Sequence, residues 1–124
     1  AYHITPEGIF QISRDHSVVE NMVAKGDLTP LEARTHPNRN LITRALGPDI
    51  HAKADTFELP WHKDEFLLLC SDGLVNTVSD QEMLFEVLHD GDVNECLDHL
   101  LQISLQRGAP DNITAVLLLN EEGR

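Results

Sequence analysis

Apolar residues follow two kinds of pattern along this chain. Two runs, residues 66–70 and 115–119, are continuously apolar, and runs this short predict buried strands. Strand-forming residues between turn signals, and one weakly alternating stretch, predict further strands. The strands expected from the sequence are residues 8–13, 41–43, 52–59, 65–71 and 113–119.

Other segments carry helix start signals, in which a Ser, Thr or Asp stands three residues before a Glu. The first residues of these signals are Ser17, Thr29, Ser79 and Asp92. Helices are therefore expected at 17–25 and 29–36, and as a pair within 79–107. The residues of the pair that should face inward are Met83, Leu84, Val87, Leu88, Cys96, Leu97, Leu100, Leu101 and Leu105.

Two aspartates stand at the ends of the two buried strands. Asp72 follows the strand at 65–71, and Asp111 precedes the strand at 113–119. If these strands are antiparallel neighbours, both aspartates come to the same edge of the sheet. Each aspartate alone is also explained by a turn, since Asp-Gly and Pro-Asp-Asn are common turn sequences. Together, two close carboxylates would repel unless a proton or a cation lay between them, and hard oxygen ligands suit Mg²⁺ or Mn²⁺.

The charge balance narrows the classes of partner. The 124 residues include 21 acidic and 9 basic ones, a net charge of −12. This argues against nucleic acid, because phosphate contacts require clustered Lys and Arg. The seven histidines are scattered without a His-x-x-x-His or Cys-x-x-Cys spacing, so the sequence does not predict a histidine metal site.

The sequence also bears on the compartment. No apolar run is long enough to span a bilayer, and the first residues, AYHITPEG, lack the features of a signal peptide. Cys70 and Cys96 lie in apolar surroundings and are expected to be buried thiols of a reducing compartment. These features predict a cytoplasmic protein.

Four stretches, SRDHS, HPNRNLITRALG, CSDGLVNTVSDQE and GAPDNITAVLL, occur in an order and spacing that resemble the protein phosphatase 2C family. These are the metal-dependent PPM-type Ser/Thr phosphatases, and the bacterial branch is the most similar. The resemblance implies an α+β fold, an α-β-β-α sandwich of two antiparallel sheets flanked by helices. It implies that Asp72 and Asp111 are ligands of a binuclear Mg²⁺ or Mn²⁺ centre. Residues 14–50 would form a flap segment, and residues 65–119 a strand-helix-helix-strand core.

Several family features are missing from this sequence. The family's first acidic motif, its Asp-Gly-x-Gly-Gly-His motif and its phosphate-binding arginine do not occur. Residues 1–124 are therefore expected to be the C-terminal portion of one catalytic domain, with one sheet face uncovered and without the bridging aspartate. Asp15 is a tempting substitute for that aspartate, but it is interpreted as a turn or helix-cap residue.

The resemblance implies hydrolysis of phosphoserine and phosphothreonine by a metal-activated water. The substrates would be phosphoproteins, expected to be those of a eukaryotic-like Ser/Thr kinase. Arg39 and Arg44 are candidates for flap contacts with a phosphopeptide, or else surface or salt-bridged arginines. His16 and His36 are candidate acids, or else structural polar residues. The alternative function is a noncatalytic, phosphatase-like regulatory or interaction domain, and the chain alone is expected to be inactive.

Overall fold

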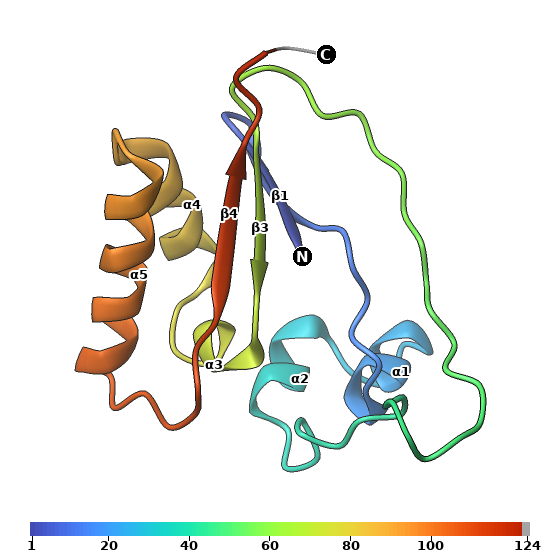
Figure 1. Ribbon diagram of the computed structural model, residues 1–124. Coiled ribbons are helices and arrows are strands. Elements are labelled where there is room, and N and C mark those ends of the chain that lie inside the picture. The colour runs from blue at the N-terminus through green and yellow to red at the C-terminus, as the bar shows by residue number, and fades with distance from the viewer. Residues whose placement is uncertain (123–124) are drawn as a thin grey trace. The chain divides into compact units, whose positions relative to one another are not determined.

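The computed structural model describes residues 1–122, which fall into two compact units (Figure 1). The first, here the sheet unit, combines Ala1–Ser13 with the chain from Leu59 onward. The second, here the inserted unit, is Arg14–Glu58. Among the described residues, no helix is long and apolar enough to cross a membrane.

The sheet unit is built on one antiparallel sheet with the strand order β2-β1-β3-β4. Its strands are β1 (Tyr2–Thr5), β2 (Gly8–Gln11), β3 (Phe66–Cys70) and β4 (Ala115–Leu119). The predictions for β2, β3 and β4 are confirmed. β1 was not predicted from the sequence. The predicted strand at 52–59 is wrong: these residues are largely exposed and form no regular structure.

Two longer helices cover one face of the sheet. α4 (Asp80–His89) and α5 (Val93–Gln106) lie on the same side of β3 and β4 (Figure 1). Both begin as predicted, at the caps Ser79 and Asp92. Between them and the sheet lies a continuous core of buried apolar side chains: Tyr2, Ile4, Leu68, Leu74, Val78, Met83, Val87, Cys96 and Leu100.

The inward face of α5 differs from the expectation at its C-terminal end. Leu101 and Leu105 are exposed (41% and 58%), so their predicted burial is wrong. Ser104 is buried there instead, and its hydroxyl bonds to the hydroxyl of Thr77. The buried positions 96, 100 and 104 are four residues apart and form one stripe, and the two leucines follow one residue later, about 100° round the helix.

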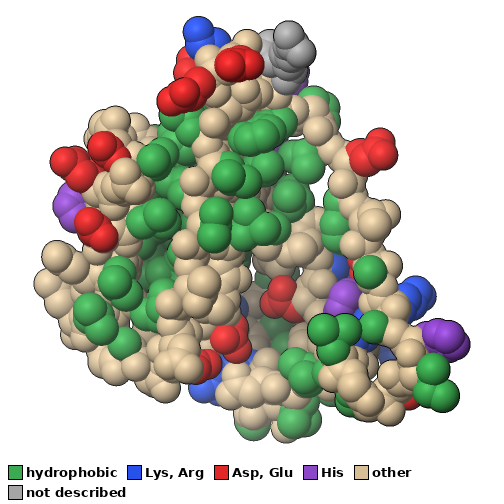
Figure 2. Space-filling model, viewed as in Figure 1, with side chains coloured by type: hydrophobic (Ala, Val, Ile, Leu, Met, Phe, Trp, Pro, Cys, Tyr) green, Lys and Arg blue, Asp and Glu red, His purple; other side chains and the backbone are tan. Residues whose placement is uncertain are grey.

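The other face of the sheet is open. Successive side chains of a strand point to opposite faces, and in β4 Val116 and Leu118 are 50% and 42% exposed. They pair across the strands with Leu69 and Leu67. The expectation that β3 and β4 are buried on both faces is therefore wrong for this chain. Apolar side chains gather over these strands in Figure 2, and the expectation of an uncovered apolar face is confirmed.

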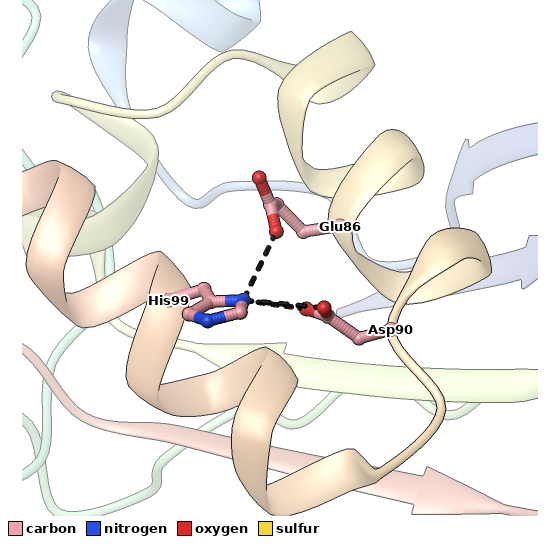
Figure 3. Close-up of side chains that lie close together, drawn as sticks. All are labelled: Glu86, Asp90 and His99. Atoms are coloured by element: carbon pink, nitrogen blue, oxygen red, sulfur yellow. Dashed lines mark hydrogen bonds and ion pairs between the residues drawn. The ribbon is translucent and has the colours of Figure 1, made fainter.

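Contacts between α4 and α5 include one polar cluster. His99 of α5 faces Glu86 of α4 and Asp90, the C-cap residue of α4, with its Nδ1 atom 3.5 Å and 3.0 Å from their carboxylate oxygens (Figure 3). The cluster lies near the turn that joins the two helices.

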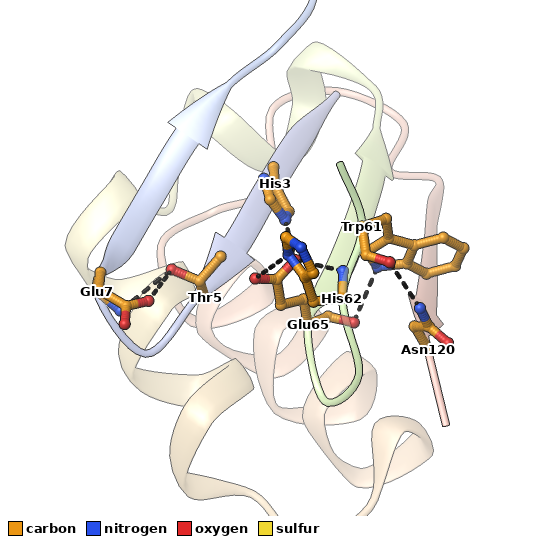
Figure 4. Close-up of polar contacts among 7 residues, drawn as sticks. All are labelled: His3, Thr5, Glu7, Trp61, His62, Glu65 and Asn120. Carbon is orange, nitrogen blue, oxygen red and sulfur yellow. Dashed lines mark hydrogen bonds and ion pairs between the residues drawn. The ribbon is translucent and has the colours of Figure 1, made fainter. Parts of the chain in front are cut away.

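A second polar network fixes the edge where β3 begins (Figure 4). The Glu65 carboxylate is 2.9 Å from His3 Nε2 and accepts a hydrogen bond from the backbone N–H of His62. The Trp61 indole donates to the backbone carbonyl of Glu65, and the Asn120 amide donates to that of Trp61. These contacts hold the segment before β3 against β1 and the end of β4.

The inserted unit contains α1 (Val18–Ala24) and α2 (Pro30–Thr35). Both helices were predicted, and Thr29 and Glu32 form the expected capping box. The predicted strand at 41–43 is reduced to a single bridge between Ser17 and Ile42.

An ion pair ties the start of α4 to the end of α5. The Arg107 guanidinium donates two hydrogen bonds to the Glu82 carboxylate (2.9 and 2.6 Å) and one to the carbonyl of Thr77 (2.7 Å). The Arg107 bonds lower the pKa of Glu82 to about 2. Because the folded pKa lies below the unfolded one, the stabilisation is present above about pH 4 and is lost as the pH falls toward 2.

We predict that Arg107→Met lowers the midpoint of urea unfolding near neutral pH and that the difference from the unsubstituted protein shrinks as the pH falls from about 5 to about 2. Arg39→Met is the control, because Arg39 donates to the carbonyl of His36 and forms no ion pair with a carboxylate of residues 1–122. Its effect should not change over this range. An Arg107→Met difference of constant size at every pH would contradict the prediction.

Candidate metal centre

Asp72 is placed by the junction between β3 and a short helix. It is the first residue of α3 (Asp72–Val75), directly after Ser71 at the N-cap position. The turn interpretation of Asp72-Gly73 is therefore wrong: Gly73 is buried in the helix and has no positive φ. The Asp72 side chain is exposed. Among the described residues, it has no hydrogen-bond or ion-pair partner.

Asp111 is placed by the loop between α5 and β4. α5 ends at Gln106 with Arg107 as its C-cap residue, and the next residue, Gly108, has a φ of +97° that favours glycine. Asp111 is exposed, and one of its oxygens accepts a hydrogen bond from the backbone N–H of Asn112 (2.7 Å). The other oxygen has no hydrogen-bond partner within the described part of the chain.

Hydrogen bonds hold the two loops together. The backbone N–H of Ser71 donates to the carbonyl of Thr114 (2.9 Å), and the N–H of Thr114 donates to the Ser71 hydroxyl (3.0 Å). The same hydroxyl lies 3.4 Å from the carbonyl of Asn112. The residue before Asp72 therefore bonds to the residue after Asp111. β3 and β4 are antiparallel neighbours, as the sequence predicted.

Gly73 makes the approach of the two segments possible. A Cβ atom at this position would lie 2.1 Å from the carbonyl oxygen of Asn112, far inside van der Waals contact. Only glycine lets the backbone of α3 come this close to the residue after Asp111. We define the clasp as residues 71–73 with 112–114.

The clasp brings together two chain segments that each carry an exposed carboxylate with oxygens available to a cation. This donor set fits a hard divalent ion. Within residues 1–122, one group of three or more metal-ligating side chains has its ligand atoms within 4.8 Å of one another, and that group is Glu86, Asp90 and His99. Asp72 and Asp111 therefore belong to no such group of described residues.

The sequence and structure of this chain are similar to those of bacterial serine/threonine phosphatases. No family model matches the sequence. The serine/threonine phosphatase Stp of Listeria monocytogenes is 35% identical over 117 residues, which cover 92% of this chain and 46% of that protein. The crystal structure of Stp1 from Staphylococcus aureus superposes with a TM-score of 0.89 and 38% identity, covering 97% of this chain and 47% of that one.

The chain belongs to the family of bacterial PPM-type serine/threonine phosphatases. It spans about half the length of the first curated relatives that it matches. Another PPM-type relative, the catalytic domain of the phosphatase PstP, was crystallised with two manganese ions. It matches with a TM-score of 0.75 and 34% identity, over 94% of this chain and 47% of that one. The α+β architecture expected from the sequence is confirmed.

The predicted flap residues of this PPM-family chain lie in the inserted unit and are held by local contacts. Asp55 accepts hydrogen bonds from His16 and Arg44 (both 2.9 Å), and these bonds lower the pKa of Asp55 to about 2. This pairing matches the salt-bridge alternative for Arg44. Asp55 is 39 residues from His16, and no sequence pattern predicts this pairing. Arg39 donates to the carbonyl of His36.

Asp15 is not a helix cap, since Ser17 caps α1. With Arg14, His16 and Arg44 it lines a polar pocket of about 220 Å³ inside the inserted unit. The substrate contacts of Arg39 and Arg44, and the metal contacts of Asp72 and Asp111, stay predictions.

We predict that Gly73→Ala lowers the free energy of unfolding by about 1–3 kcal/mol, because the new methyl group forces the clasp apart. Gly91→Ala is the matched control: a Cβ there meets no atom within 4 Å, and its φ is not positive. Urea unfolding measures both. Equal effects of the two substitutions would contradict the role of Gly73.

Proposed function

We propose that this chain is the C-terminal half of a metal-dependent phosphatase domain that hydrolyses phosphoserine and phosphothreonine in proteins. The observation that carries the proposal is the clasp, in which Gly73 and Ser71 fit against Asn112 and Thr114 beside the two exposed aspartates. An interaction domain without a metal centre has no chemical need for free carboxylates at this junction.

In this proposal Asp72 and Asp111 hold divalent cations, Mn²⁺ or Mg²⁺, with ligands from the other half of the domain. The bound metals would activate a water for in-line attack on phosphorus and would stabilise charge on the phosphate. Ser71 and Asn112 contribute by fixing the backbone on each side of the aspartates. The Asn112 N–H holds one oxygen of Asp111 and so restricts the rotation of that side chain.

The substrates that we propose are phosphoproteins, including those of a eukaryotic-like Ser/Thr kinase, in the cytoplasm. Residues 14–50 would act as a flap beside the site. Arg44 could contact a phosphopeptide only by leaving Asp55 or by using the guanidinium nitrogens that Asp55 does not bind, since its NH1 already donates to that carboxylate. Arg39 is exposed and donates to a backbone carbonyl, so it is the easier of the two to redirect.

We predict that, in the full-length protein, Asp72→Asn or Asp111→Asn lowers phosphatase activity by more than about a hundredfold. Losing a metal ligand should cost more than the 10–100-fold that losing an outer-shell partner costs. Asp98→Asn is the control, because Asp98 is an exposed aspartate of α5 whose side chain has no partner in the described part of the chain. Phosphopeptide hydrolysis with Mn²⁺, together with calorimetric Mn²⁺ titration, measures the effect. Full activity in either clasp variant would refute the ligand assignment.

We also predict that the purified 124-residue chain shows little or no Mn²⁺-dependent hydrolysis of a phosphopeptide or p-nitrophenyl phosphate. The reason is that the described residues offer two clasp carboxylates and no third ligand beside them. The control is the full-length protein in the same assay. Robust turnover by the chain alone would overturn this prediction. A full-length protein that binds no Mn²⁺ at micromolar concentration would support the alternative, a noncatalytic regulatory or interaction domain.

A further inference from the structure

The polar cluster between α4 and α5 has the composition of a metal site. It contains one imidazole and two carboxylates, and the ligand atoms of Glu86, Asp90 and His99 all lie within 4.8 Å of one another (Figure 3). Glu86 lies in the last turn of α4, and Asp90 is the C-cap residue that follows the helix. This cluster was not predicted from the sequence, because its residues come from two separate segments and the usual histidine spacings of metal sites are absent.

The two distances from His99 Nδ1 to the carboxylate oxygens are close to those of a filled site. In a tetrahedral zinc site with bonds of about 2.0–2.1 Å, neighbouring ligand atoms are roughly 3.3 Å apart. His99 Nδ1 lies 3.0 Å from one oxygen of Asp90 and 3.5 Å from one of Glu86. Small side-chain rotations would therefore bring all three atoms to a common ion, and a water would complete four-coordination.

The charges of the cluster also favour a divalent cation. The two carboxylates are only 15% and 20% exposed, while His99 is 50% exposed and gives access from solvent. Protonated His99 leaves the group with one net negative charge, whereas a divalent ion with neutral imidazole leaves none. The hydrogen bond and charge of Asp90, with the charges of Glu86 and Glu95, raise the pKa of His99, although partial burial opposes this. Metal and proton would thus compete for Nδ1.

The cluster is separate from the clasp. It lies near the α4–α5 turn, at the end of the helical layer opposite α3 (Figure 1). His99 is eight positions before Arg107 at the end of α5, about 12 Å along the helix axis. A metal here would not touch Asp72 or Asp111.

We propose that Glu86, Asp90 and His99 form a zinc site that links α4 to α5. Its role is to join the two helices that cover the sheet, and it is independent of the phosphatase centre. Cys96 lies one turn before His99 and is buried, but its thiol is not in the group of converging ligand atoms. The bound ion therefore has nitrogen and oxygen ligands only.

The test is a zinc titration against a chromogenic chelator, made in the Asp72→Asn/Asp111→Asn background so that the clasp cannot contribute. We expect one site per chain with micromolar or tighter affinity, stronger at pH 8 than at pH 6 because the proton on His99 must leave. The Co²⁺-substituted protein should show ligand-field bands without thiolate charge transfer. Long-range ¹H–¹⁵N spectra should show the metal on Nδ1 of His99.

His99→Gln and Glu86→Gln should each weaken zinc binding by more than about tenfold. His62→Gln is the matched control: His62 also faces a carboxylate, that of Glu65, at 3.4 Å, but it belongs to no described group of three ligands. Circular dichroism shows whether each variant is folded, and the two cluster variants provide independent tests. Millimolar affinity, thiolate charge transfer or unchanged binding in a folded His99→Gln or Glu86→Gln variant would overturn the proposal.

Discussion

The clasp is the contact on which the rest of the candidate catalytic site depends. Backbone atoms of α3 lie against the carbonyl of Asn112 at a distance that excludes even one methyl group. Two further hydrogen bonds between Ser71 and Thr114 lock the same segments. Because the backbone takes part in each of these contacts, they set the positions of the segments that carry Asp72 and Asp111 more rigidly than side-chain packing would.

The clasp in turn depends on the helical layer. α3 follows β3 without a loop, and α4 starts after the Thr77–Ser79 segment, which Arg107 holds from the end of α5. α5 then delivers the chain to Asp111 through Gly108. The helix pair therefore connects the segment after Asp72 to the segment before Asp111. Contacts between α4 and α5, such as the Glu82–Arg107 ion pair and the His99 cluster, stabilise this connection from positions outside the clasp.

Most helices and the two neighbouring strands β3 and β4 could be predicted from the sequence because their signals are local. Helix starts were found because caps are local: Ser79 and Glu82 satisfy each other's backbone within one turn. The neighbouring strands were found because both runs are continuously apolar. The role of Gly73 was not predicted, since a glycine in a turn and a glycine packed against a distant backbone look alike in sequence. The partners of Asp55 and of His99 were also missed, because each pairing joins exposed polar residues without a periodic pattern.

The open sheet face explains why the expected burial of β3 and β4 on both faces is wrong. Leu69, Val116 and Leu118 belong to runs that read as buried on both sides, yet they are 45%, 50% and 42% exposed here. An apolar sheet face of this kind is what a second sheet packs on in a sandwich. Both faces of β3 and β4 are thus apolar, while the helices of this chain pack on one face only. The chain spans about half the length of its phosphatase relatives, and we propose that the apolar pattern of β3 and β4 suits a longer domain. In that proposal, a second sheet of the longer domain would cover the open face.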